Sequence, residues 1–177
     1  MLALIVWNNR QSPQETLLFT GIIFHSFGDM LLDIDGVDFF LPALVTFLIG
    51  HIFYIFTFKP DVSFSRTFSN AKKFWVAAII LFAVGLGTIL LPKLESRLVI
   101  PVFIYIVAIS TMTICTVLAN YRTAWISLGA MSYLLSDAMI AINTFVQPFS
   151  ASALLIWPTY YLGQVLIAMG FLREKHL

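Results

Sequence analysis

Long apolar runs separated by short polar breaks make up most of this chain. Six of these runs are long enough for a helix that crosses a bilayer, which needs ~20 residues. The breaks contain turn-forming residues such as Lys59-Pro60 and Gln147-Pro148. Runs of this length favour helices over buried strands. We therefore predict six transmembrane helices, over residues 15–32, 38–58, 74–91, 98–119, 123–146 and 152–172.

The composition supports a membrane protein. Hydrophobic residues make up 60% of the chain and charged residues 11%, against roughly a quarter charged in soluble domains. With 177 residues the chain has little left for a soluble domain. We expect one all-α transmembrane bundle over 1–177. The apolar start, Met1 to Trp7, is too short for a span and lacks a basic leader, so it is either an interfacial segment or the end of a longer helix.

Lysine and arginine positions predict the orientation. Cytoplasmic loops carry an excess of these residues. One side would hold eight of them and the other only Lys93 and Arg97. We therefore expect a multi-pass protein of the cell (inner) membrane with both chain ends cytoplasmic and the acidic 33–38 loop on the other side. The eight are Arg10, Lys59, Arg66, Lys72, Lys73, Arg122, Arg173 and Lys175.

Two aspartates within these runs, Asp29 and Asp137, are the best indication of function. A carboxylate near the middle of a membrane costs about 2.5–3.5 kcal/mol on insertion scales, so such groups usually face a protein interior. We predict that both face one polar cavity. Asp29 lies near the end of its run, so a capping or interfacial role stays open for it.

Further polar residues share helix faces with these aspartates. Spacings of three and four place His25 with Asp29, and Tyr133 lies one turn before Asp137. We expect these groups to line the cavity, although hydrogen bonding between helices would also explain them. The candidates for binding or orienting are His51, Tyr133, Tyr161 and Gln164, with His25, Tyr54 and Ser136 as secondary candidates.

Common catalytic and binding signatures do not occur. The sequence has no HExxH and no paired cysteines, Cys115 being its single cysteine, so we expect neither a metal nor another cofactor. The net charge of +1 and the absence of a dense basic tract argue against a nucleic-acid partner.

The motifs taken in order resemble the YhhN family of membrane proteins, whose characterised members are lysoplasmalogenases. The resemblance is carried by Ser26-Phe27-Gly28-Asp29, Gly50-His51 with Tyr54, Ser136-Asp137, and Tyr161 with Gln164. It covers roughly residues 20–170. The family is usually drawn with about eight transmembrane helices, so this chain is expected to be shortened at its N-terminus.

The resemblance implies hydrolysis of the vinyl ether bond of a lysoplasmalogen to a fatty aldehyde and a glycerophospho-base. The implied partners are this lysophospholipid and bilayer lipid. Protonation of the vinyl carbon needs a general acid, and the attack of water needs a base or a stabilising anion. We assign the deeper Asp137 as the acid and Asp29 as its ionised partner, and the assignment is reversible.

Two other classes of membrane protein use paired intramembrane acids. A proton- or cation-coupled transporter is the main alternative, but the sequence lacks the inverted repeats and broken helices that are typical of one. An intramembrane aspartyl protease ranks lowest, because Leu135-Ser136 stands before Asp137 where a GxGD element is expected.

Overall fold

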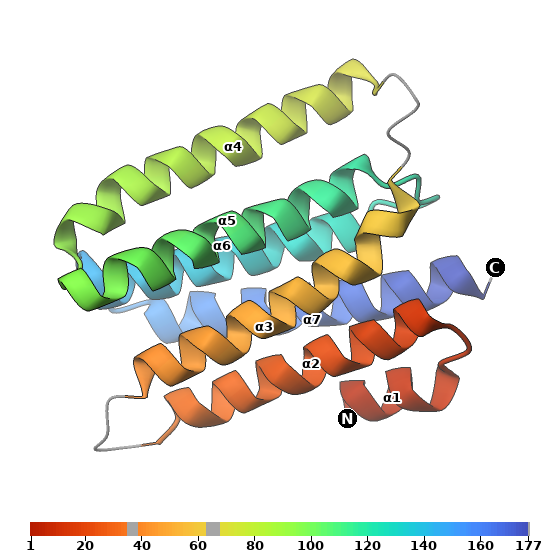
Figure 1. The fold of residues 1–177 in the computed structure, drawn as a ribbon, viewed down its shortest axis with the longest axis horizontal. Helices are drawn as coiled ribbons and strands as arrows, with labels where there is room; N and C mark the ends of the chain where they lie inside the picture. The colour runs from red at the N-terminus through yellow and green to blue at the C-terminus, as the bar shows by residue number, and fades with distance from the viewer. Residues whose placement is uncertain (35–38, 63–67, 177) are drawn as a thin grey trace.

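The computed structural model describes residues 1–34, 39–62 and 68–176, and helices account for nearly all of them (Figure 1). A single β-bridge joins Val62 and Ala119. Among these residues there are seven α-helices and two short 3-10 turns, η1 (Lys59–Asp61) and η2 (Leu91–Lys93). The helices are α1 (Leu2–Asn9), α2 (Pro13–Leu32), α3 (Phe40–Phe58), α4 (Asn70–Leu90), α5 (Ser96–Leu118), α6 (Trp125–Phe145) and α7 (Ser152–Lys175).

Each of the six predicted runs forms a helix, α2 to α7, with ends that shift by a few residues. Five of these, α3 to α7, are long and apolar enough to cross a membrane. Five of the six predicted spans are therefore candidate membrane spans by length and composition, and a sixth is not confirmed. Helix α2 carries His25, Asp29 and Glu15, which reduce its hydropathy. Asp38, the predicted start of the second run, and Arg66, one of the counted cations, lie outside the described residues.

Helix α2 begins before its apolar run because its first turn is capped. The Ser12 side chain accepts from the Glu15 backbone N–H, and the Glu15 carboxylate accepts from the Ser12 backbone N–H at 2.8 Å. This reciprocal capping box, followed by Pro13 at the first helical position, fixes the start of the helix. Glu15 is also 2.9 Å from Nε2 of His176, which ties the end of α7 to the start of α2.

The helices are layered in an order that differs from the order of the chain. Figure 1 shows α4 along one edge, α5 and α6 next to it, then α3 and α7, with α2 and the short α1 at the opposite edge. The most extensive contacts join α6 to α7 and α2 to α3. Helices α6 and α7 approach closely at Gly129 and Gly163. A Cβ atom on Gly129 would lie 2.8 Å from the Gly163 carbonyl oxygen, so this crossing requires glycine.

Polar contacts hold one end of the bundle together. Nζ of Lys175 lies 2.9 Å from Asp61, and the Tyr121 hydroxyl donates to the same carboxylate at 3.0 Å. Burial and the Asp61 charge raise the pKa of Tyr121, so its hydroxyl stays a donor at neutral pH. Glu174 accepts from the backbone N–H of Arg122 at 3.0 Å. The ends of α3, α5 and α7 are thereby joined.

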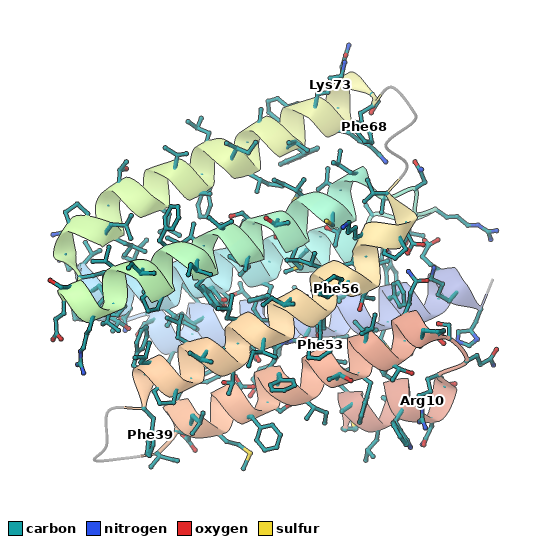
Figure 2. All side chains as sticks on the ribbon, viewed as in Figure 1. Arg10, Phe39, Phe53, Phe56, Phe68 and Lys73 are labelled. Carbon is teal, nitrogen blue, oxygen red and sulfur yellow. The ribbon has the colours of Figure 1, made fainter. Side chains whose placement is uncertain are left out.

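Most lysine and arginine side chains of the described residues lie at this same end of the bundle. The α1–α2 turn, the start of α4 and the end of α7 lie together there in Figure 1, whereas the α4–α5 connection, which carries Lys93 and Arg97, lies at the opposite end. Figure 2 shows Arg10 and Lys73 near the cation-rich end.

The outer surface between the two ends is apolar. Phe56 on α3, labelled in Figure 2, is 54% exposed, and Leu81 on α4 is 74% exposed. Exposed apolar side chains on long helices match a hydrocarbon surrounding.

Candidate functional site

Asp137 on α6 lies at the junction of three helices. Its side chain is 12% exposed, and the hydroxyl of Tyr105 on α5 donates to its Oδ2 atom. Nε2 of His51 on α3 is 2.9 Å from the Tyr105 oxygen and 3.6 Å from Asp137 Oδ2. His51 is fully buried. The Asp137 carboxyl is therefore held by a tyrosine, which is in turn held by a histidine.

Asp29 on α2 has a similar partner. The hydroxyl of Tyr160 on α7 donates to Asp29 Oδ2 at 2.9 Å. The Tyr160 ring packs against that of Tyr133 on α6, with centroids 4.9 Å apart. The Tyr133 ring also contacts that of His51, the histidine beside Asp137, with centroids 5.1 Å apart. Residues far apart in the sequence thus place two tyrosine-bound carboxyls in one region of the bundle.

A second polar group lies beside these carboxyls. The Tyr54 hydroxyl donates to Oε1 of Gln164 at 2.6 Å, and Nε2 of Gln164 lies 3.1 Å from Nδ1 of His25. The His25 ring lies directly against α3 at Gly50, where a Cβ atom would come within 2.5 Å of the imidazole. Gly50 is needed for this close approach, which gives the Gly50-His51 pair a structural role.

The two carboxyls line different pockets, whereas the sequence predicted one shared cavity. Asp29 lines a polar pocket of about 270 Å³, together with Tyr160, Gln164 and His25. Asp137 lines an apolar pocket of about 70 Å³, and among the described residues that line it only Asp137 and Tyr105 are polar. The buried rings of His51, Tyr133 and His25 pack against one another, with centroids 4.7 to 5.2 Å apart.

Two predicted residues lie away from this centre. Tyr161 lines the polar pocket but is 56% exposed and stacks on Trp157, with ring centroids 5.9 Å apart. Ser136 is buried, and its hydroxyl donates to the backbone oxygen of Ile156 at 3.0 Å, so it ties α6 to α7. Within the described part of the chain, no three His, Cys, Asp or Glu side chains gather closely enough to hold a metal ion.

The structure adds two residues to the predicted set. Tyr105 and Tyr160 are the direct partners of Asp137 and Asp29. Tyr105 is the one tyrosine within the apolar run 98–119, and a buried phenol needs a partner for its O–H, which is a signal that the sequence contains.

Comparisons with known proteins agree on one family. A protein of Mycobacterium bovis named lysoplasmalogenase is 33% identical to this chain over 156 residues, which are 87% of the chain and 59% of that protein. The human proteins named lysoplasmalogenase TMEM86A and TMEM86B are each 29% identical over 174 residues, covering 92% and 98% of this chain and 68% and 71% of theirs. The chain therefore spans only part of the length of these relatives.

No solved structure matches the chain. The model of the YhhN family matches residues 1–171, nearly the whole sequence. The chain belongs to the YhhN family.

Proposed function

We propose that this protein hydrolyses the vinyl ether bond of lysoplasmalogen, with Asp137 as the acid and Asp29 as the base. The family and the names of its relatives support the reaction class. The observation that carries the proposal is the pair of intramembrane carboxyls, each bound by a tyrosine hydroxyl.

The first step is protonation of the vinyl carbon remote from the ether oxygen. Asp137 supplies this proton from Oδ1, which makes no hydrogen bond among the residues that the structure describes, while Oδ2 accepts from Tyr105. The carbon–carbon double bond breaks as the new C–H bond forms, leaving an oxocarbenium ion. The Tyr105 hydroxyl then stabilises the Asp137 carboxylate, because hydrogen bonds to charged groups are worth about 1.5–3 kcal/mol.

Water attacks the carbon that bears the ether oxygen and loses a proton to Asp29, giving a hemiacetal. The hemiacetal collapses when Asp29 returns this proton to the departing glycerol oxygen and the hydroxyl proton passes to Asp137. The products are a fatty aldehyde and a glycerophospho-base, and both carboxyls regain their first state. Tyr160 orients Asp29, and His51 holds the Tyr105 oxygen.

The two pockets suit the two ends of this substrate. The apolar pocket at Asp137 takes the start of the alkenyl chain, and the polar pocket at Asp29 takes the glycerol and phosphate. A volume of about 70 Å³ corresponds to about five or six waters, at ~10–15 Å³ for each. It therefore holds the first few methylenes, and the rest of the chain lies among bilayer lipid.

The proposal includes α2 as a sixth span. It places the protein in the cell (inner) membrane with both chain ends on the cytoplasmic side. Twenty helical residues reach about 30 Å, which is enough to cross. The distribution of cations supports the orientation. In a Cys115→Ala background, a cysteine at Lys93 should react with an impermeant reagent outside intact cells and one at Arg122 should not. The reverse pattern contradicts the orientation.

Aldehyde release by the purified protein in lipid nanodiscs tests the function. We expect release from a vinyl ether lysolipid, none from the saturated ether analogue, and no effect of a chelator. A transporter would move an ion or solute and release no aldehyde. Absence of release from the vinyl ether lipid, or its loss on chelation, contradicts the proposal.

A further inference from the structure

Three rings that contact one another, with centroids 4.7 to 5.2 Å apart, each carry a buried polar atom without a hydrogen-bond partner among the described residues. Of the four buried side-chain nitrogen and oxygen atoms without a hydrogen-bond partner among the described residues, three are His25 Nε2, His51 Nδ1 and Tyr133 OH. The Phe47 carbonyl lies beside His25 and the Tyr160 hydroxyl beside Tyr133, both outside hydrogen-bond geometry. A buried polar group without a partner is costly, so three of them on contacting rings indicate a ligand.

The neighbours determine which nitrogen of His25 carries the proton. Gln164 accepts from Tyr54 through Oε1, so its amide nitrogen is the atom facing His25. An amide nitrogen only donates. His25 Nδ1 is therefore an acceptor, and in the neutral ring Nε2 carries the hydrogen and points a donor into the gap.

The same reasoning applies to His51. The Tyr105 hydroxyl donates its hydrogen bond to Asp137, so the Tyr105 oxygen is the acceptor in its contact with His51 Nε2. In the neutral His51 ring the hydrogen is then on Nε2, and Nδ1 presents a lone pair to the gap. His25 thus offers a donor and His51 an acceptor from rings whose centroids lie 4.7 Å apart, and the Tyr133 ring contacts both.

We infer that this three-ring cluster of His25, His51 and Tyr133 binds one buried water molecule. The water accepts from His25 Nε2, donates to His51 Nδ1 and pairs with the Tyr133 hydroxyl. Buried waters typically make about three such bonds to otherwise unsatisfied groups. The rings are fully or almost fully buried, with exposures of 1%, 0% and 0%, and His25 also borders the polar pocket, through which water can enter.

This water completes a chain of hydrogen bonds that all point the same way. Tyr54 donates to Gln164, Gln164 to His25, His25 to the water, the water to His51, His51 to Tyr105, and Tyr105 to Asp137. Hydrogen bonds in such a chain polarise one another. This series of hydrogen bonds ends at Asp137 Oδ2, which gains negative charge when Asp137 gives up its proton. Its effect on catalysis therefore rests on the proposed function. Tyr54 and Gln164 are then positioning residues for Asp137.

Solid-state NMR of the whole ¹⁵N-histidine-labelled protein in bilayers tests the water site without any enzyme assay. His176→Gln removes the third histidine signal. We expect both remaining rings to carry their proton on Nε2, and water protons to transfer magnetisation to His25 Nε2 and His51 Nδ1. A proton on Nδ1 of either ring overturns the inference. So does a direct His25 N–H to His51 nitrogen coupling without water contact.

Two variants test the direction of the chain. Gln164→Met removes the donor to His25, and Tyr54→Phe removes the hydroxyl that orients the Gln164 amide. Both should let His25 place its proton on either nitrogen, and both should lower kcat about fivefold, the factor expected for one hydrogen bond. KM should stay unchanged in Tyr54→Phe, because Tyr54 does not line the pocket at Asp29, whereas Gln164 does. Tyr121→Phe removes a hydroxyl that is not part of this series of hydrogen bonds, and it should change neither the His25 tautomer nor kcat. An unchanged His25 tautomer in both variants contradicts the inference.

The two proposals fail in different ways. If the NMR pattern is found but no aldehyde is released, the water site stands and the hydrolase function falls. If aldehyde is released but the pattern is absent, the function stands and the water site falls.

Discussion

Removal of the Tyr105 hydroxyl is the sharpest perturbation of the proposed acid. Tyr105→Phe keeps the ring that packs beside His51, at a centroid distance of 5.2 Å, and removes only the oxygen. That oxygen makes two contacts: it donates to Asp137 and accepts from His51. The variant therefore separates the hydrogen bonds from the packing.

The expected loss follows from the bond to Asp137. This bond strengthens as Asp137 becomes a carboxylate, so its removal affects the transition state more than substrate binding. A hydrogen bond to a charged group is worth about 1.5–3 kcal/mol, which corresponds to a kcat about 10 to 150 times lower. KM should stay within about twofold of the wild-type value, because the ring that lines the apolar pocket is kept and the lost hydroxyl is occupied by Asp137 and His51.

Steady-state aldehyde release in nanodiscs measures both constants. Tyr121→Phe is the matched control, since it removes a hydroxyl bound to Asp61 at the end of the bundle and should leave both constants unchanged. Size-exclusion profiles and thermal midpoints show whether each variant is folded. A folded Tyr105→Phe protein with wild-type kcat would refute the role of Tyr105 and weaken that of Asp137 as the acid.

Three further predictions concern the surroundings of the carboxyls. Tyr160→Phe should lower kcat by a similar factor of about 10 to 150, because Asp29 loses its hydroxyl donor; wild-type kcat would exclude Asp29 as the base that Tyr160 orients. Gly50→Ala should lower thermal stability by about 1–3 kcal/mol, since its Cβ would lie 2.5 Å from the His25 ring, whereas Gly85→Ala, with nothing within 4 Å, should not. Ala138→Phe fills the apolar pocket and should raise KM at least tenfold, while Leu135→Phe on the exposed face should not; equal KM values would place the alkenyl chain elsewhere.

Much of the fold follows from the sequence because the apolar runs are long. Each run became a helix. The starts of α2 and α4 lie earlier than predicted, since Ser12 and Ser69 cap turns that hydropathy alone does not detect. Hydropathy does not show whether α2 spans the membrane. The polar residues that lower the hydropathy of α2, such as Glu15 and His25, are buried in the bundle and do not face lipid.

The candidate site was predictable in part. His25, His51 and Gln164 lie in the polar centre, as their position at membrane depth suggests. Tyr160 rather than its neighbour Tyr161 meets Asp29, and helical spacing from Gln164 does not separate the two, since positions three and four apart share a face. The two carboxyls line separate pockets rather than one shared cavity, an outcome of tertiary packing that the pattern of polar residues does not specify.

The most direct test of the central claim compares three aspartate-to-asparagine variants. Asn keeps the shape of the side chain but neither donates a carboxyl proton nor carries a negative charge. Asp29→Asn and Asp137→Asn should each lower aldehyde release at least 100-fold, within the ~10²–10⁴ range of general acid–base catalysis. Asp33→Asn, at an exposed carboxyl one turn beyond Asp29, should keep wild-type activity. Folded Asp29→Asn or Asp137→Asn protein that releases aldehyde at the wild-type rate would contradict the two-carboxyl mechanism.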